Sequence, residues 1–102
     1  MSVAPLSIAY LGDAASAAAF ALAGVAAEAP APGAERSAFE RACTGAHLVL
    51  LGARCAAALP ADVLARALAS LAPLVAIVPD PAGTTPLPDA ARRVRRELGI
   101  EA

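Results

Sequence analysis

The chain of 102 residues is long enough to bury one hydrophobic core and too short for two, so we expect one domain. Its net charge of −1 leaves no field that would attract nucleic acid or an anionic membrane surface. No positive charge precedes the apolar N-terminal run, and the uncharged residues 14–27 are too few to cross a bilayer, so we expect a cytoplasmic protein without a signal peptide.

Residues 6–25 predict a strand, a turn and a helix. A short apolar run consists of Leu6, Ile8, Ala9, Tyr10 and Leu11, and Gly12 and Asp13 end it. Such a run is typical of a strand that is buried on both faces. Asp13 is placed to cap the alanine-rich helix that follows, and Gly24 is placed to end that helix in a left-handed turn. A strand, a turn and a helix at the start of the chain predict an α/β fold.

The next strand and helix have weaker patterns. Residues 25–28 are a strand candidate that Pro30 and Pro32 end, although alanine is a poor strand former. Residues 33–44 predict a short helix, with Phe39 on its inward face and charged side chains outside. The regular alternation of strands and helices is the main support for this strand.

The middle of the chain has the clearest pattern. Residues 46–51 read AHLVLL, which predicts a buried strand with Leu50 in the core. Pro60 is placed to begin a helix over residues 61–71. One apolar face of this helix is formed by Val63, Leu64, Ala67, Leu68 and Leu71.

Residues 74–78 predict a fourth strand, which its flanking prolines place at an edge of the sheet. Strands and helices therefore alternate along the chain. Right-handed crossovers between them would give an α/β fold with a four-stranded parallel sheet and helices on both faces, as in flavodoxin-like and receiver-like proteins.

The last part of the chain predicts a separate element. Four prolines exclude regular structure from residues 79–88, and a helix follows. We therefore divide the chain into a globular body at 1–79, a proline-rich connector at 80–88 and a C-terminal helix at 89–102 for packing on a partner. A narrow apolar stripe along this helix consists of Leu87, Ala91, Val94 and Leu98.

Asp13 is the main candidate for a binding residue, because sheets of this kind bind ligands at the carboxyl ends of their strands. A receiver-like phosphorylation site would also need an Asp after the third strand and a lysine, and the chain has no lysine. We therefore interpret Asp13 as a helix cap. The glycine spacing of a dinucleotide site and the P-loop are both missing from the sequence, so we expect no cofactor.

The remaining reactive side chains do not form a recognisable site. His47, the single histidine, begins a strand with no nucleophile near it in the sequence, and we interpret it as structural. Cys43 and Cys55 lack the spacing of a zinc or redox site and are expected to be small buried residues. The sequence therefore predicts neither a metal site nor an active site.

Four arginines flank the apolar stripe of the C-terminal helix: Arg92, Arg93, Arg95 and Arg96. A cluster of this kind is often a solvated helix face that also complements the negative helix end. Beside a narrow apolar stripe it equally suits docking on an acidic or coiled-coil partner, which is the interpretation we favour.

Four separated stretches resemble the F-subunit of the V-type (A/V-type) rotary ATPases. They are Gly12 and Asp13 with Phe20, LAGV at residues 22–25, VAIVPDP at residues 75–81, and ELGI at residues 97–100. Their order and spacing together produce the resemblance. The second helix and the alanine-rich, lysine-free surface depart from the family.

The resemblance implies a non-catalytic subunit of the central stalk, or rotor, in a complex that couples ATP synthesis or hydrolysis to proton or sodium transport. One copy per complex would bind the coiled-coil D-subunit of the stalk, peripheral to the membrane. The fold-defining residues would be Gly12, Asp13, Phe20 and Gly24. The partner-binding residues would be Arg92, Arg93, Val94, Arg96, Leu98 and Ile100. The alternative is a stand-alone receiver-like or small-ligand-binding domain.

Overall fold

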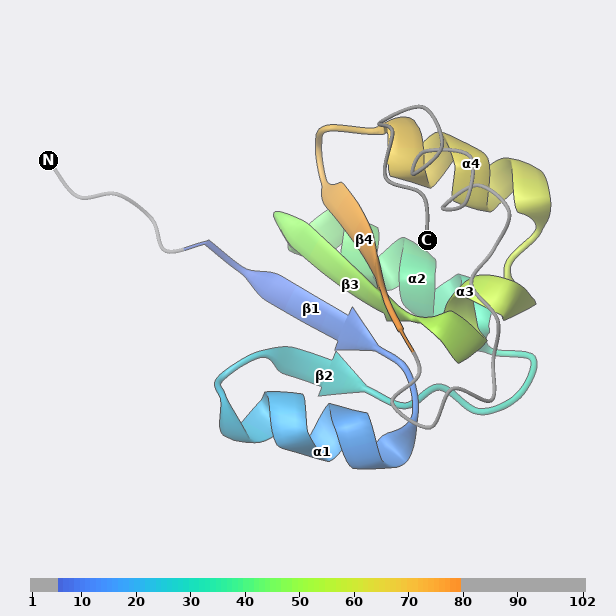
Figure 1. Ribbon diagram of the computed structural model, residues 1–102. Coiled ribbons are helices and arrows are strands. Elements are labelled where there is room, and N and C mark those ends of the chain that lie inside the picture. The colour runs from blue at the N-terminus through green and yellow to red at the C-terminus, as the bar shows by residue number, and fades with distance from the viewer. Residues whose placement is uncertain (1–5, 80–102) are drawn as a thin grey trace, which may run out of the picture.

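The computed structural model describes residues 6–79, which form a four-stranded sheet with helices on it (Figure 1). The strands are β1 (Ile8–Leu11), β2 (Ala26–Glu28), β3 (Leu48–Gly52) and β4 (Leu74–Val78). The helices are α1 (Ala14–Leu22), α2 (Glu35–Gly45), α3 (Ala53–Ala58) and α4 (Ala61–Ala69). All strand pairs are parallel, in the order β2-β1-β3-β4, so the predicted α/β fold is confirmed. The expected connector at 80–88 and helix at 89–102 lie outside the described residues.

Helices cover both faces of the sheet, and the side chains of β1 show which helix lies on which face. Tyr10 points toward α1, where its ring stacks on Phe20, whereas Leu11 points the other way into a core shared with α2, α3 and α4. Figure 1 shows α1 on one side of the sheet and α2 and α3 behind it. None of the helices in this part of the chain is long and apolar enough to cross a membrane.

The main core lies between the sheet and α2, α3 and α4. Val49 and Leu51 of β3 are fully buried there, because β3 has a neighbouring strand on each side and helices above it. The buried members of this core are Leu11, Ala38, Phe39, Val49, Leu51, Cys55, Ala56, Leu59, Leu64 and Val75. Several of them are small, so a few large side chains supply most of the buried apolar area.

The side chains of β3 alternate in burial, which the apolar sequence did not predict. Leu48 and Leu50 are only half-buried, whereas Val49 and Leu51 are inaccessible. Leu50 faces the side of the sheet on which, among the described helices, only α1 lies, and α1 packs over β1 and β2. The expectation that Leu50 is a core residue is therefore wrong, and Leu51 has that place.

The segment after β3 forms two short helices, and the second ends earlier than predicted. Pro60 precedes the first residue of α4, and Ser70, in extended conformation, ends the helix after Ala69. Leu71 was expected on the apolar face of this helix, but it lies beyond the helix and is 85% exposed. The helical spacing of Leu71 in the sequence is therefore a coincidence, because the backbone has already turned toward β4.

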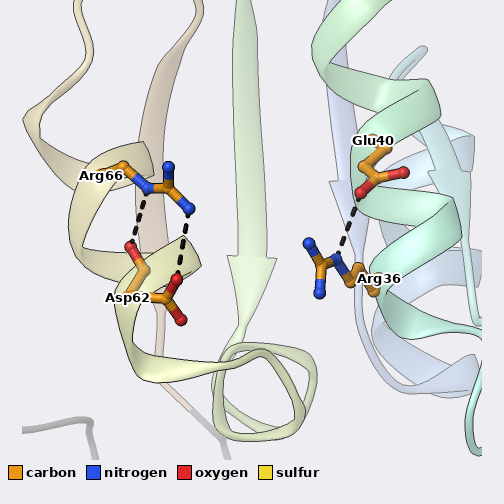
Figure 2. A network of polar contacts seen from close by, with 4 residues as sticks. All are labelled: Arg36, Glu40, Asp62 and Arg66. Atoms are coloured by element: carbon orange, nitrogen blue, oxygen red, sulfur yellow. Dashed lines mark hydrogen bonds and ion pairs between the residues drawn. The ribbon is translucent and has the colours of Figure 1, made fainter.

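The outer faces of α2 and α4 are charged. Each has one ion pair between side chains four residues apart, Arg36 with Glu40 at 3.2 Å and Arg66 with Asp62 at 3.3 Å (Figure 2). In α4 the acidic residue comes first, which is the order that also suits the helix dipole. Both pairs are well exposed, so each stabilises its helix by only about 0.3–0.5 kcal/mol.

We expect Leu51→Ala to reduce the free energy of unfolding by about 2–5 kcal/mol, because it leaves a cavity beneath three helices. Leu50→Ala should cost clearly less, since that side chain is only half-buried. Leu22→Ala is the matched control, and because Leu22 is 92% exposed it should cost less than about 0.5 kcal/mol. Chemical denaturation of the three variants tests this, and equal costs at positions 50 and 51 would contradict the assigned faces of β3.

Candidate functional site

The carboxyl-terminal edge of the sheet is the place where this architecture binds ligands. β1 and β3 lie side by side, and the chain leaves β1 toward α1 on one face and β3 toward α3 on the other. A crevice usually opens at such a point, and ligands enter it. Gly12 follows β1 and Gly52 ends β3, so both sides of this crevice are backbone without side chains.

The side chain of Tyr10 fills this crevice. A methyl group built on Gly12 would overlap the hydroxyl and the ring of Tyr10, and one built on Gly52 would lie 2.9 Å from the same hydroxyl. Tyr10 is only 1% exposed. The two glycines are therefore needed because the tyrosine occupies the space that their side chains would take.

Tyr10 is held there by α1. Its ring stacks on Phe20, with centroids 4.3 Å apart and planes 25° apart. Its hydroxyl donates a long hydrogen bond of 3.5 Å to Oδ1 of Asp13. Burial raises the pKa of the Tyr10 phenol above 10.0, and the nearby carboxylate of Asp13 adds to this effect.

Asp13 acts as the N-cap of α1, as its position predicted. Its Oδ2 accepts a hydrogen bond of 3.0 Å from the backbone N–H of Ser16, which would otherwise lack a partner. Hydrogen bonds from the backbone and side chain of Ser16 lower the pKa of the Asp13 carboxyl below 3.8. Both carboxylate oxygens thus have partners within the protein.

Gly24 ends α1 in the left-handed conformation that was predicted for it. Its φ is 90°, a value that side chains disfavour. The N–H of Gly24 donates to the carbonyl of Ala21 and that of Val25 to the carbonyl of Phe20, both at 3.1 Å. This pair of bonds is a Schellman motif. Phe20 therefore contributes both to this cap and to the packing of Tyr10.

The predicted partner-binding residues cannot be placed beside this edge. Arg92, Arg93, Val94, Arg96, Leu98 and Ile100 all lie outside the described residues. Tyr10 and Gly52 were not singled out from the sequence. Tyr10 stands two residues before Gly12, so both lie on the same face of the strand, and this spacing is the sequence feature that could have predicted their contact. The sequence does not reveal that β3 brings Gly52 to the same point.

His47 lies at the opposite, amino-terminal edge of the sheet. Its Nδ1 accepts a hydrogen bond of 3.1 Å from the backbone N–H of Ser7, and the Ser7 hydroxyl donates to the carbonyl of Gly45 at 3.0 Å. Because a backbone N–H can only donate, Nδ1 is the acceptor, and the neutral ring carries its proton on Nε2. His47 thus joins the starts of β1 and β3, which agrees with its structural interpretation.

The two cysteine side chains are buried to different degrees. Cys55 is buried in the main core and Cys43 is half-buried beside it. Burial raises the pKa of both thiols, so neither has the thiolate character of a reactive cysteine. Within residues 6–79, His, Cys, Asp and Glu side chains form no group of three that could hold a metal ion.

Two surface pockets lie away from the crevice. One of about 410 Å³ lies at the amino-terminal edge, lined by residues 43–47 and 71–73. Another of about 290 Å³ lies between β2 and α2, beside the ion pair of Glu28 with Arg41. The larger pocket adjoins His47, so it belongs to the edge opposite the usual ligand site.

Gly12→Ala tests the fit of Tyr10 into the crevice. We expect it to reduce the free energy of unfolding by about 1–3 kcal/mol, because the new methyl group and the tyrosine ring cannot occupy one space. Gly45→Ala is the matched control, since a methyl group there meets no atom within 4 Å. Denaturant melts of both variants provide the measurement. Equal stabilities would show that the crevice has room for a side chain.

The ionisation of Tyr10 can be followed directly, because the chain has one tyrosine and no tryptophan. We expect the phenolate absorbance of the folded protein to appear at a midpoint above pH 10.0, and that of the denatured protein near 10.0. Since the folded-state pKa is the higher one, burial of Tyr10 contributes fully to stability below pH 10.0 and loses its effect as pH rises through the folded pKa. A native midpoint at or below 10.0 would contradict the burial of the hydroxyl.

Comparison with models of known protein families found no match to this chain, and comparison with curated proteins found none either. The likeness to a known family therefore depends on the four stretches of sequence described above. The roles of Tyr10, Asp13 and Gly24 follow from the contacts of these residues and hold whatever the family of the chain.

Proposed function

We propose that this chain is a central-stalk component of a V-type or A-type rotary ATPase, equivalent to the F-subunit. In this role it has no active site of its own. It binds the coiled-coil D-subunit, is peripheral to the membrane as part of the complex, and helps to couple ATP synthesis or hydrolysis to proton or sodium transport.

The observation that carries this proposal is the agreement between the sequence stretches of the resemblance and particular positions in the fold. Gly12 and Asp13 form the turn from β1 to α1, and Gly24 forms the end of α1. The VAIV of the third stretch falls on β4, the edge strand that leads to the C-terminal segment. Residues that produce the resemblance thus lie at the turns and the strand that build the sheet.

The filled crevice favours this proposal over a receiver-like or ligand-binding domain. Such a domain needs open space at the carboxyl ends of its strands, and a receiver-like domain also needs acidic side chains that are free there. Here Tyr10 occupies the space between Gly12 and Gly52, and the Asp13 carboxylate caps α1. A ligand would have to displace a buried tyrosine and a helix cap together.

Binding to the D-subunit is the decisive measurement. We expect the purified chain and the D-subunit from the same organism to elute as one complex in size exclusion, and Val94→Asp to weaken their affinity tenfold or more by placing a charge in the apolar stripe. Arg92→Ala or Arg96→Ala should mainly slow association in a salt-dependent way. Truncation of residues 92–102 should weaken binding while the melting temperature of the body stays nearly unchanged.

Two results would contradict the proposal. Separate elution of the chain and the D-subunit at micromolar concentrations would remove its basis. Binding of a phosphodonor or nucleotide that is lost in Asp13→Asn would favour the alternative of a receiver-like or small-ligand-binding domain. In that case the tyrosine would have to leave the crevice, and the alkaline midpoint of Tyr10 would shift when the ligand binds.

A further inference from the structure

The helix α1 carries no charged residue, although one side of it faces away from the sheet. Its sequence is AASAAAFAL, and its inward side is formed by Ala17, which is buried, and by Phe20, which stacks on Tyr10. A second row of apolar side chains follows the helical spacing i, i+3, i+4 and i+7 on the exposed side: Ala15, Ala18, Ala19 and Leu22. We call this row the α1 stripe. A helix that is apolar on all sides is typical of a buried helix.

The helices on the other face of the sheet have outer faces that suit water. α2 and α4 each carry an ion pair there, Arg36 with Glu40 and Asp62 with Arg66 (Figure 2). The α1 stripe has no such side chain, and its Leu22 is 92% exposed. Exposed apolar side chains that lie together mark contact surfaces more often than scattered ones do. This contrast between the two faces argues that the α1 stripe is a contact surface.

The sheet beside α1 is bare on the same face. α1 packs over β1 and β2, and no other helix of residues 6–79 lies on that side of the sheet (Figure 1). The strand register places Leu50 beside Tyr10, Leu74 beside Leu48 and Ala76 beside Leu50, so all these side chains point to the face of α1. Leu48 and Leu50 are half-buried, while Leu74 and Ala76 are exposed. We call the surface of Leu48, Leu50, Leu74 and Ala76 the β3–β4 trough.

The dimensions of the trough match those of a helix like α1. Two neighbouring strands are about 10 Å wide, which is the diameter of a helix with small side chains. β3 and β4 have five residues each and span about 16 Å, whereas the nine residues of α1 span about 14 Å. β3 and β4 also contain no charged residue. A helix with the size and the uncharged surface of α1 therefore fits the trough.

A two-fold axis can place the α1 of a second copy in this trough. The axis runs parallel to the strands, at the height of α1 above the sheet and between α1 and the trough. Rotation by 180° about it puts the second α1 beside the first, over β3 and β4, and puts the second copy's β3 and β4 over the first α1. The two helices then form one layer between two sheets. Each copy covers what the other leaves open, so the contact is isologous and closes as a dimer.

The side chains that meet in this arrangement are matched in size. The rotation keeps the direction along the strands, and α1 runs antiparallel to them, so its last residue lies at the height where β4 begins. Leu22 of one copy therefore meets Leu74 of the other, and these are the large exposed side chains of the two surfaces. Ala18, the middle residue of α1, meets Ala76, the middle residue of β4. Small side chains at the centre allow the helix to approach the second sheet closely.

We propose that the α1 stripe and the β3–β4 trough form the interface of a homodimer of the free chain, an inference that does not rest on the stalk function proposed above. A single segment in the trough would leave the α1 stripe exposed, whereas a second copy covers both surfaces. A membrane surface fits less well, because helices that lie on membranes carry Lys or Arg on a polar face and α1 has neither. The shared face measures about 19 Å by 16 Å, which is small for an interface, so we expect a dissociation constant in the micromolar range.

Ala18→Glu and its matched control Ala65→Glu test the interface in the full chain. Both residues are exposed alanines at the fifth position of a nine-residue helix, and only Ala18 belongs to the α1 stripe. In sedimentation between about 1 and 300 µM, we expect the mass of the wild type and of Ala65→Glu to rise from 10.0 kDa toward twice that value. Ala18→Glu should weaken dimerisation about tenfold or more. Melting temperatures in dilute solution, where the chain is monomeric, should agree for all three proteins.

Ala76→Arg tests whether the stripe of one copy lies in the trough of the other. We expect this variant alone to dimerise about tenfold more weakly than the wild type, because two arginines enter the apolar interface. An equal mixture with Ala18→Glu should form a heterodimer at concentrations where neither variant dimerises alone. In that heterodimer one contact pairs Glu with Arg and the other contact is wild type. Contact of α1 with α1 alone predicts no such rescue.

The possible results separate the dimer from its alternatives. A wild-type chain that stays monomeric up to about 300 µM overturns the proposal. If Ala76→Arg also lowers the melting temperature of such a monomer, the trough is covered by another segment of the same chain. A dimer that Ala18→Glu leaves intact, or a mixture of the two variants that does not associate, overturns the interface assigned here. Since none of these measurements includes the D-subunit, their failure and a failure of the stalk function are distinguishable.

Discussion

The structure depends on the close approach of the Tyr10 hydroxyl to the backbone at Gly12 and Gly52. This contact fixes the spacing of β1 and β3 at their carboxyl ends, where the chain departs to opposite faces of the sheet. The same tyrosine contacts Phe20 and Asp13 of the α1 unit, so the helix is positioned through its ring as well as through its cap. One buried side chain thus joins two strands and a helix on the face of the sheet opposite the main core.

The sequence predicted those parts of the fold that have local causes. The turn at Gly12 and Asp13, the left-handed Gly24 and the edge strand between prolines each follow from a few neighbouring residues. The errors arose where burial depends on distant elements. Leu50 looks like Val49 in the sequence, but it faces the side of the sheet that α1 covers only in part, and Leu71 continues a helical spacing after the helix has ended. Likewise, no local pattern shows that Tyr10 meets Gly52, since this contact requires the pairing of β1 with β3.

The two ends of the sheet have opposite characters. At the carboxyl-terminal edge, polar groups are satisfied within the protein and the crevice is filled, so the usual site for a ligand is closed. At the amino-terminal edge, apolar side chains remain in contact with water beside an open pocket. Exposing leucines costs solubility, whereas filling the crevice contributes to stability. The exposed leucines and the open pocket thus lie toward the edge of the sheet opposite the one where folds of this kind bind ligands.

The two border strands of the sheet, β2 and β4, affect how readily the free protein aggregates. β2 is only three residues long and Pro30 follows it closely, while β4 lies between Pro73 and Pro79. Short strands and prolines deprive a neighbouring chain of the continuous row of N–H and C=O groups needed to extend the sheet. Despite the high content of hydrophobic residues, the two border strands of the described part of the chain are therefore poor templates for cross-β aggregation, and of the four exposed leucines only Leu74 belongs to one of these strands.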